Sequence, residues 1–215
     1  MTPTDTKARI LDAAEQLFSQ RGFAATSTRD ITAAAAVNLA AVNYHFGAKA
    51  ELVREVFRRR FGALNDERLA RLARAEAEAT PAAPSVPAIV RALVAPALHL
   101  GAEQGQACMR LMGRVHSEPA EFVVELVRDH FAEVRTRFLS ALRRSVPDLS
   151  DEQAFLRLFF VVGAMAHSMG ASHHLALLAA HGRHPFVLEE VEDELVRFGT
   201  AGILAEVGAA AEAKR

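Results

Sequence analysis

The side chains best suited to chemistry in this sequence lie between residues 28 and 49, and the chemistry they suit is DNA recognition. The amide of Asn43 can pair bidentately with adenine, while Leu39 and Ala40 can contact thymine methyl groups. Leu39 and Asn43 are four residues apart, which places them on one face of a helix. Residues able to bind phosphates and fix the register on the duplex surround them: Thr28, Arg29, Tyr44, His45 and Lys49.

Two short helices joined by a tight turn are needed to position these side chains, and residues 26–49 predict that arrangement. Ser27 and Asp30 have the spacing of a capping box at the start of the first helix, and Ser150 and Gln153 have the same spacing at the start of a later one. Asn38 suits the N-cap of the second helix, because its side-chain oxygen can accept free backbone N–H groups. The outer face is small and partly polar, as in a helix-turn-helix that enters a major groove. The residues expected to face the core are Val37, Val42 and Phe46.

A longer series of residues extends this pattern in both directions. It consists of Ile10-Leu11-Asp12-Ala13-Ala14, Leu17-Phe18, Gly22-Phe23, Thr26-Ser27-Thr28-Arg29-Asp30-Ile31, Val37, Tyr44-His45-Phe46, Lys49 and Leu52. As a set it resembles the N-terminal domain of TetR-type transcriptional regulators, which implies that Tyr44 and Lys49 contact DNA. One departure is Ala36, where the family usually has glycine. A non-glycine residue is disfavoured in a left-handed turn, so this turn could be shaped differently here.

Composition places the whole chain in the all-α class. Of the 215 residues 51% are hydrophobic, and strand signals are nearly absent. A net charge of −1 excludes a polycation, so nucleic-acid binding requires a local basic surface. The single cysteine, Cys108, and the lack of a signal sequence indicate the cytoplasm. No hydrolase elbow, phosphate-binding glycine loop or carboxylate pair is found, so we expect neither an enzyme nor a cofactor.

Helical periodicity, prolines and glycines divide the chain into helices. Pro96 should kink the helix that contains it, because proline lacks a backbone N–H. Residues 68–78 alternate charged and small side chains and should form a solvated helix end. We expect a helix-turn-helix DNA-binding domain over residues 1–48 and a helical bundle for ligand binding and dimerisation over residues 49–215. The expected helices cover residues 7–20, 49–79, 89–101, 106–116, 119–146, 151–180 and 187–207.

The segment Leu158–Ala180 contains no Asp, Glu, Lys or Arg and is long enough to span a bilayer. Glycines, serines and histidines interrupt it, so burial against the core and a second subunit is the better interpretation. His167, His174 and His181, in and directly after this segment, are seven residues apart. About 10 Å separates positions two turns apart, so we expect no metal site. The TetR resemblance implies a homodimer interface from the last two helices. The expected interface residues are Gly163, Gly170, His174, Leu195 and Phe198.

An effector site is expected in the central helices. Arg110, Arg114 and His116 follow one another around a helix that is otherwise apolar. They could form an exposed stripe or the polar rim of a cavity, where guanidinium groups would match a carboxylate or phosphate. The apolar residues expected to line the cavity are Phe122, Leu126, Phe131, Phe159, Val162, Met165 and Met169.

Three segments, residues 37–47, 109–113 and 163–169, resemble the fatty-acid-responsive branch of TetR-type regulators. This narrower resemblance implies a fatty acid or acyl-CoA as a small hydrophobic effector, with a flat, drug-like hydrophobe as the alternative. The function expected from all these features is a dimeric, ligand-responsive repressor that binds a pseudo-palindromic operator in double-stranded DNA. The alternative is a small-molecule-binding or enzymatic bundle with a vestigial helix-turn-helix, which Ala36 supports and a gel-shift assay would test.

Overall fold

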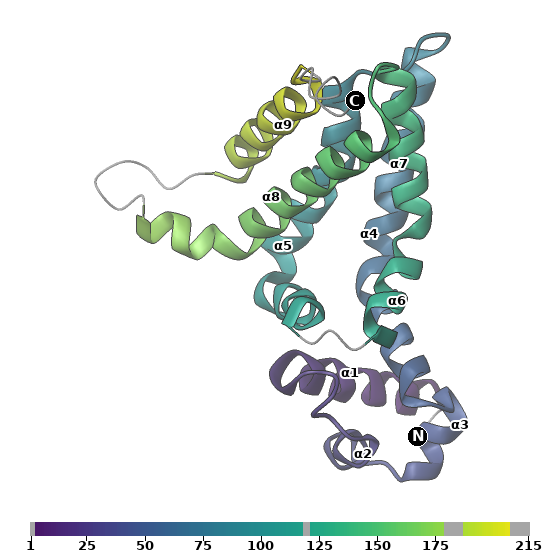
Figure 1. Cartoon of the computed structure of the whole chain (residues 1–215). Coiled ribbons are helices and arrows are strands. Elements are labelled where there is room, and N and C mark those ends of the chain that lie inside the picture. Colours follow the sequence, from purple (N-terminus) through teal and green to yellow (C-terminus); the bar gives the residue numbers. More distant parts are fainter. Residues whose placement is uncertain (1–2, 118–120, 179–186, 207–215) are drawn as a thin grey trace, which may run out of the picture. The chain divides into compact units, whose positions relative to one another are not determined.

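The computed structural model describes residues 3–117, 121–178 and 187–206. Within these ranges nine α-helices follow one another and no strand occurs, which confirms the all-α class (Figure 1). The helices are α1 (Pro3–Arg21), α2 (Thr28–Ala35), α3 (Leu39–Phe46), α4 (Lys49–Ala79), α5 (Val86–Ser117), α6 (Glu121–His130), α7 (Ala132–Ser145), α8 (Asp151–Leu178) and α9 (Leu188–Leu204).

Several helix ends agree with the prediction because local signals set them. Helix α4 begins at Lys49 and ends at Ala79, as expected. At the start of α8, the backbone N–H of Gln153 donates to the Ser150 hydroxyl at 3.2 Å, and the Ser150 N–H donates to the Gln153 side chain at 3.1 Å. This is the predicted capping box. Gly22 follows the last residue of α1 with φ 92°, the conformation that glycine permits after a helix.

One predicted helix interruption is absent, and one interruption that was not predicted is present. The segments expected as separate helices at 89–101 and 106–116 belong to one helix, α5, because a single glycine weakens a helix without ending it. The helix expected over 119–146 is divided at Phe131 into α6 and α7. There the carbonyl of His130 accepts a hydrogen bond from Asn65 Nδ2 of α4 at 3.2 Å. This long-range contact supplies a partner outside the helix, and no local pattern predicts it.

The chain divides by packing into two compact units. The first contains Met1–Asp66 and Glu103–Glu133, and the second contains Glu67–Ala102 and Val134–Arg215. The division therefore passes through α4 and α5, and each unit holds a part of both helices. The functional boundary expected at residue 48 stays a prediction.

In the first unit, α1 packs on α2 and α3, and phenylalanine rings join α1 to α4. The ring centroids of Phe18 and Phe23 are 5.3 Å apart, and those of Phe23 and Phe57 are 6.0 Å apart. The buried Glu15 side chain of α1 accepts hydrogen bonds from Arg59 and Arg60 of α4. These contacts fix the three N-terminal helices to the first part of α4.

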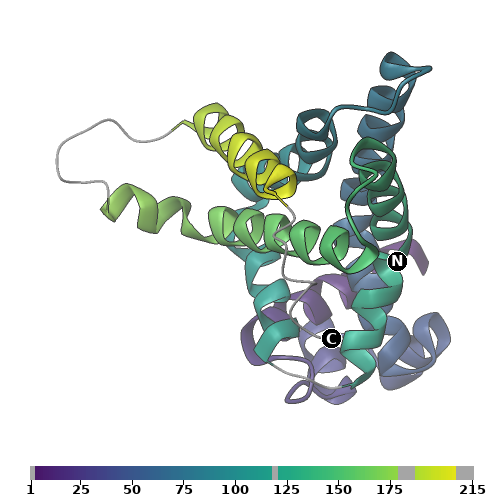
Figure 2. The same ribbon diagram turned by 45° about the horizontal axis from the view of Figure 1, so that its top comes forward.

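In the second unit, α8 and α9 lie side by side (Figures 1 and 2). A Cβ atom at Gly199 of α9 would lie 3.1 Å from both Val161 of α8 and Val90 of α5, so glycine permits this close approach. Gly163 was expected at the homodimer interface. A Cβ there would meet nothing within 4 Å in its own protomer.

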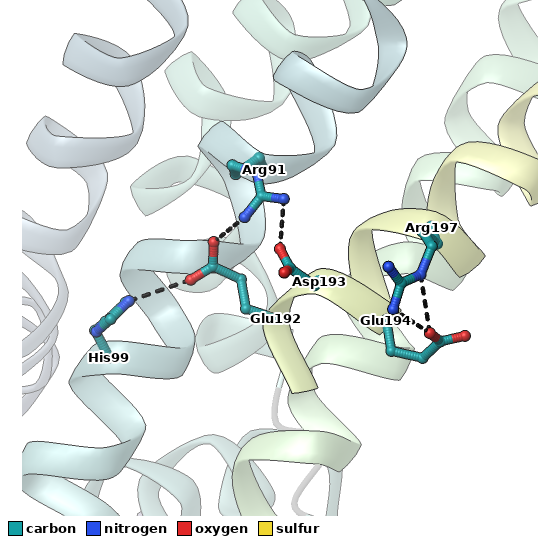
Figure 3. Close-up of polar contacts among 6 residues, drawn as sticks. All are labelled: Arg91, His99, Glu192, Asp193, Glu194 and Arg197. Carbon is teal, nitrogen blue, oxygen red and sulfur yellow. Dashed lines mark hydrogen bonds and ion pairs between the residues drawn. The ribbon is translucent and has the colours of Figure 1, made fainter. Parts of the chain in front are cut away.

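Polar contacts tie α9 to α5 within the same unit (Figure 3). The Glu192 carboxylate of α9 accepts a hydrogen bond from Arg91 and lies 3.2 Å from His99 Nε2. The second guanidinium nitrogen of Arg91 lies 2.7 Å from Asp193. Because the Glu192 carboxylate has charged or polar partners on two turns of α5, its burial beside the core is compensated.

Arg68 is buried, although the sequence predicted a solvated helix end from this residue onward. Only 4% of its surface is exposed. Its Nε donates to the Leu93 carbonyl at 2.9 Å, and its Nη2 lies 3.4 Å from Met165 Sδ. Pro96 removes one hydrogen bond from α5 and displaces carbonyls of the preceding turn, so an outside donor suits this stretch.

Two other expectations concern membranes and metals. No helix among the described residues combines the length and apolar character needed to cross a membrane. The described side chains also include no group of three His, Cys, Asp or Glu residues that could hold a metal ion. The side chain of His174, an expected interface residue, lies outside the described set.

Candidate nucleic-acid interface

The start of α2 is built by the predicted capping box. The Ser27 N–H donates to Asp30 Oδ2 at 2.8 Å, and the Asp30 N–H donates to the Ser27 hydroxyl at 3.1 Å. Hydrogen bonds from Ser27 lower the pKa of Asp30, which keeps its carboxylate ionised and turned to its own helix. Arg29 is exposed and Thr28 half-exposed in the first turn, where the helix dipole favours a phosphate.

The turn between α2 and α3 keeps a left-handed residue although that residue is alanine. Ala36 has φ 51° and ψ 49°. Its neighbour Val37 donates its N–H to the Thr32 carbonyl at 3.0 Å, and the Arg9 guanidinium of α1 donates to the carbonyls of both Ala35 and Ala36. The suggestion that the turn is reshaped by the lack of glycine is therefore wrong, because Arg9 and backbone bonds hold the strained conformation.

Helix α3 presents the three predicted base-reading residues to solvent. The Asn38 side chain accepts the Ala41 N–H at 2.9 Å, as expected of an N-cap. Val42 and Phe46 are buried, and Val37 is half-buried, so the inner face follows the prediction. The outer residues Leu39, Ala40 and Asn43 are all exposed.

The predicted phosphate-binding residues of α3 and α4 differ in how they are held. Tyr44 is 83% exposed, and its ring meets His45 edge-on with centroids 5.1 Å apart. Lys49 is half-buried, and its Nζ donates to the Phe23 carbonyl. This contact positions the Lys49 side chain at the start of α4. The DNA contacts themselves stay predictions.

Lys7 and Arg9 of α1 both brace this interface. Lys7 Nζ lies 2.6 Å from Glu55 of α4 and 5.9 Å from the ring centroid of Phe46 in α3. A hydrogen bond from Arg58, aided by Lys7, lowers the pKa of Glu55 to about 2. Because these contacts join distant residues, sequence spacing gave no signal for them.

The structure divides the expected effector residues between the two units. In the first, the Phe131 ring lies 6.0 Å from Phe61, and Arg114 donates to the carbonyls of Ser19 and Gln20 at the end of α1. In the second, Met165 is buried and Met169 half-buried. The side chains that lie outside the described set are Arg110, His116, Phe122 and Leu126.

Helices α8 and α9 expose a set of large apolar side chains. Phe159 and Val162 were expected inside a cavity, but they are 58% and 37% exposed. Phe198 is 64% exposed, whereas Leu195, expected at the interface, is buried in its own protomer. The difference for α8 follows from the rotation of this helix about its axis, which apolar periodicity alone does not fix when a helix is apolar all round. The exposed residues that the sequence analysis did not select are Phe155, Leu156, Phe160 and Leu204.

Comparison with protein families covers most of the chain. Residues 10–56 match the family described as bacterial regulatory proteins, tetR family. Residues 91–202 match the family described as tetracyclin repressor-like, C-terminal domain. The second match alone spans more than half of the chain.

Individual curated relatives match this chain over a shorter stretch. The HTH-type transcriptional regulator TtgR of Pseudomonas putida is 47% identical over 49 residues, which are 23% of each chain. AcrR of Shigella flexneri, described in the same words, is 42% identical over 53 residues, 25% of each chain. These matches span about a quarter of the length of the curated relatives.

Solved structures extend the likeness of fold to nearly the whole chain. A putative transcriptional regulator from Pseudomonas aeruginosa has a TM-score of 0.63 at 18% identity, with 94% of this chain and 90% of that chain covered. A tetR-family regulatory protein from Rhodococcus has a TM-score of 0.62 at 15% identity, with 92% and 96% covered.

Proposed function

Because the chain belongs to the TetR family of bacterial regulatory proteins, we propose that it is a ligand-responsive transcriptional repressor that binds operator DNA as a homodimer. The observation that carries this proposal is the exposed face of α3. That face combines an amide with small apolar side chains, on a helix whose N-cap is satisfied and whose inner side is buried.

Base recognition falls to Asn43, Leu39 and Ala40, and phosphate binding to the residues around them. The N-terminal turn of α2, with Thr28 and Arg29, offers N–H groups and a guanidinium for one phosphate. Other phosphates are bound by Tyr44, His45 and Lys49. The net charge of −1 is compatible with this assignment, because the required positive charge is local.

Dimerisation falls to α8 and α9, whose exposed phenylalanines support an apolar interface. A two-fold dimer presents two copies of α3, and its operator is then pseudo-palindromic with half-sites about 34–36 Å apart, or multiples of that distance. Gly163, with open space at its Cβ position, lets the helix of a second protomer approach closely.

A small hydrophobic effector releases the dimer from DNA by favouring a conformation in which the two α3 helices are badly spaced. Linkage makes this coupling reciprocal, so the operator weakens effector binding by the same factor. The narrower resemblance supports a fatty acid or acyl-CoA. Arg114, one of the candidates for binding an anionic head group, is instead held by two backbone carbonyls of α1, which weakens that support.

A gel-shift assay with the upstream region of the gene tests the proposal. We expect a retarded complex that the same DNA, but not scrambled DNA, displaces. Asn43→Ala should cost about 1–3 kcal/mol on the cognate site and relax its base preference. Lys49→Ala should weaken all DNA alike and flatten the salt dependence. An unchanged ratio of cognate to random binding in Asn43→Ala contradicts the base-reading assignment, and no complex at any salt concentration favours a vestigial helix-turn-helix.

A further inference from the structure

We propose that Asn65 and His130 form the polar end of an effector site within the first unit, and that this site selects an aromatic ligand carrying a neutral hydrogen-bond donor, such as a phenol. The inference rests on the proposed function for its regulatory meaning. The binding site itself depends only on contacts between α4 and the end of α6.

Asn65 supplies an acceptor without a partner. The residue is only 8% exposed, and its Nδ2 donates to the His130 carbonyl. That bond fixes the orientation of the amide, since a reversed amide would bring two carbonyl oxygens together. The Oδ1 atom is buried and has no hydrogen-bond partner in the protein. A buried acceptor is normally satisfied, so this oxygen indicates a missing donor.

His130 supplies a second buried acceptor. Burial lowers the pKa of its imidazole, against the effect of a hydrogen bond with the Phe61 backbone, so the ring is neutral at pH 7. Its Nε2 is buried and unpartnered, and we therefore assign the bond to the Phe61 carbonyl to Nδ1–H. A neutral imidazole that donates through Nδ1 has an acceptor at Nε2.

Aromatic rings surround the imidazole. Its centroid lies 6.4 Å from Phe57, 6.3 Å from Phe61 and 5.0 Å from Phe131, and each of these rings meets it edge-on. His130 and Phe131 are both partly exposed, so the group reaches the surface of the unit. The site thus combines aromatic walls with two acceptors. A carboxylate has no proton to donate to either acceptor and would lose its hydration, so this group disfavours a fatty-acid head.

The position of the site gives it a route to DNA binding. Asn65 lies on α4, which begins three residues after the last residue of α3, and His130 is the last residue of α6 before the break at Phe131. A ligand that lies against Asn65 and His130 links α4 to the interruption between α6 and α7. A ligand bound at this site can therefore change the orientation of α4, and with it that of α3.

Calorimetry on the full chain with three matched probes tests the inference: 4-propylphenol, propylbenzene and 3-phenylpropanoate. We expect the phenol to bind about tenfold or more tightly than propylbenzene, the factor expected of one hydrogen bond to a buried acceptor. The carboxylate should bind no better than propylbenzene. Equal affinity for the phenol and propylbenzene, or no binding of any probe, overturns the proposal.

Two variants locate the donor contact. Asn65→Leu and His130→Phe each remove one acceptor at similar volume. The variant that removes the acceptor of the phenol hydroxyl should lose the preference for the phenol, and both variants should leave propylbenzene affinity unchanged. Leu64→Met, a conservative change at the neighbouring buried position, is the control and should retain the preference. If both acceptor variants retain the preference for the phenol, the proposed site is wrong. If one of the two variants does not fold, the other still tests the site.

Operator binding, measured by gel shift on the same samples, separates this inference from the proposed function. If the chain binds its operator but none of the probes, the proposed repressor function stands and the proposed effector site is rejected. If it binds the phenol selectively but does not recognise the operator, the effector site stands and the repressor function is rejected.

Discussion

The three-helix head (α1–α3) and the α8–α9 pair expose opposite kinds of surface. Among the described residues of the head, the large apolar side chains that are exposed are Leu39 and Tyr44, both at positions assigned to DNA. The α8–α9 pair exposes Phe159, Phe160 and Phe198 at 58–64%. The head is complete without a protein partner, whereas a surface with several exposed phenylalanines is typical of a protein interface.

The difference also concerns how each region is stabilised. Short-range caps such as Ser27 with Asp30 define the helices of the head. The α8–α9 pair depends instead on close packing around Gly199 and on partners far away in sequence, such as Arg91 with Glu192. Substitution of an exposed phenylalanine of the pair should therefore change assembly, whereas substitutions at the internal contacts of either region should change the stability of the protomer.

Replacement of an exposed phenylalanine of α8 should have the largest effect, and it should act on assembly. Phe159→Ser removes the side chain from both halves of a two-fold interface, a loss of about 3–6 kcal/mol if each ring is fully covered. Sedimentation should show a dimer for the natural chain and monomers for the variant at micromolar concentration. Val124→Ser, at an equally exposed residue of α6, is the control and should remain dimeric. A monomeric natural chain contradicts the interface.

Removal of the buried carboxylate of the head should come next. Glu15→Ala deprives Arg59 and Arg60 of their shared buried partner and should cost about 2–4 kcal/mol of unfolding free energy. Asp12→Ala is the matched control, because Asp12 lies 2.8 Å from Arg59 but is 69% exposed at its side chain, and it should cost under ~1 kcal/mol. Urea unfolding measures both. Equal costs would show that burial of Glu15 does not matter.

The two glycines of α9 should respond in opposite directions. Gly199→Ala places a Cβ 3.1 Å from two valines and should destabilise the chain by about 1–2 kcal/mol. Gly202→Ala has open space and should stabilise it by about 0.5–1 kcal/mol through helix propensity. Thermal unfolding of the two variants compares them directly. Stabilisation by both changes would contradict the close packing of α9 on α8 and α5.

These contrasts explain how much could be predicted. The caps at Ser27, Asn38 and Ser150 each join residues three apart, and all were correctly expected. The break at Phe131 and the burial of Arg68 depend on partners more than twenty residues away, and sequence spacing does not contain them. The candidate DNA-binding residues were found because local signals place them. The pair Asn65 and His130 was not found, because the two are 65 residues apart and neither stands in a motif.

The smallest expected effect tests the brace on the turn of the head. Ala36→Gly relieves a left-handed alanine, and after the greater flexibility of unfolded glycine is allowed for, the gain should be about 0.5–1 kcal/mol. Arg9→Ala should lose a similar amount, because two carbonyls of the turn lose a charged donor. If Arg9 offsets the strain, the glycine variant should gain more stability in the Arg9→Ala background than in the natural one.

Operator affinity should respond differently from stability in this experiment. The backbone at Ala36 already has the conformation that glycine would adopt, so Ala36→Gly should leave α3 in place and operator binding unchanged. A vestigial helix-turn-helix predicts the reverse, with operator binding appearing only once glycine is restored. A gain of tenfold or more in operator affinity on Ala36→Gly would therefore show that the natural turn holds α3 wrongly, and that the head is not complete without its glycine.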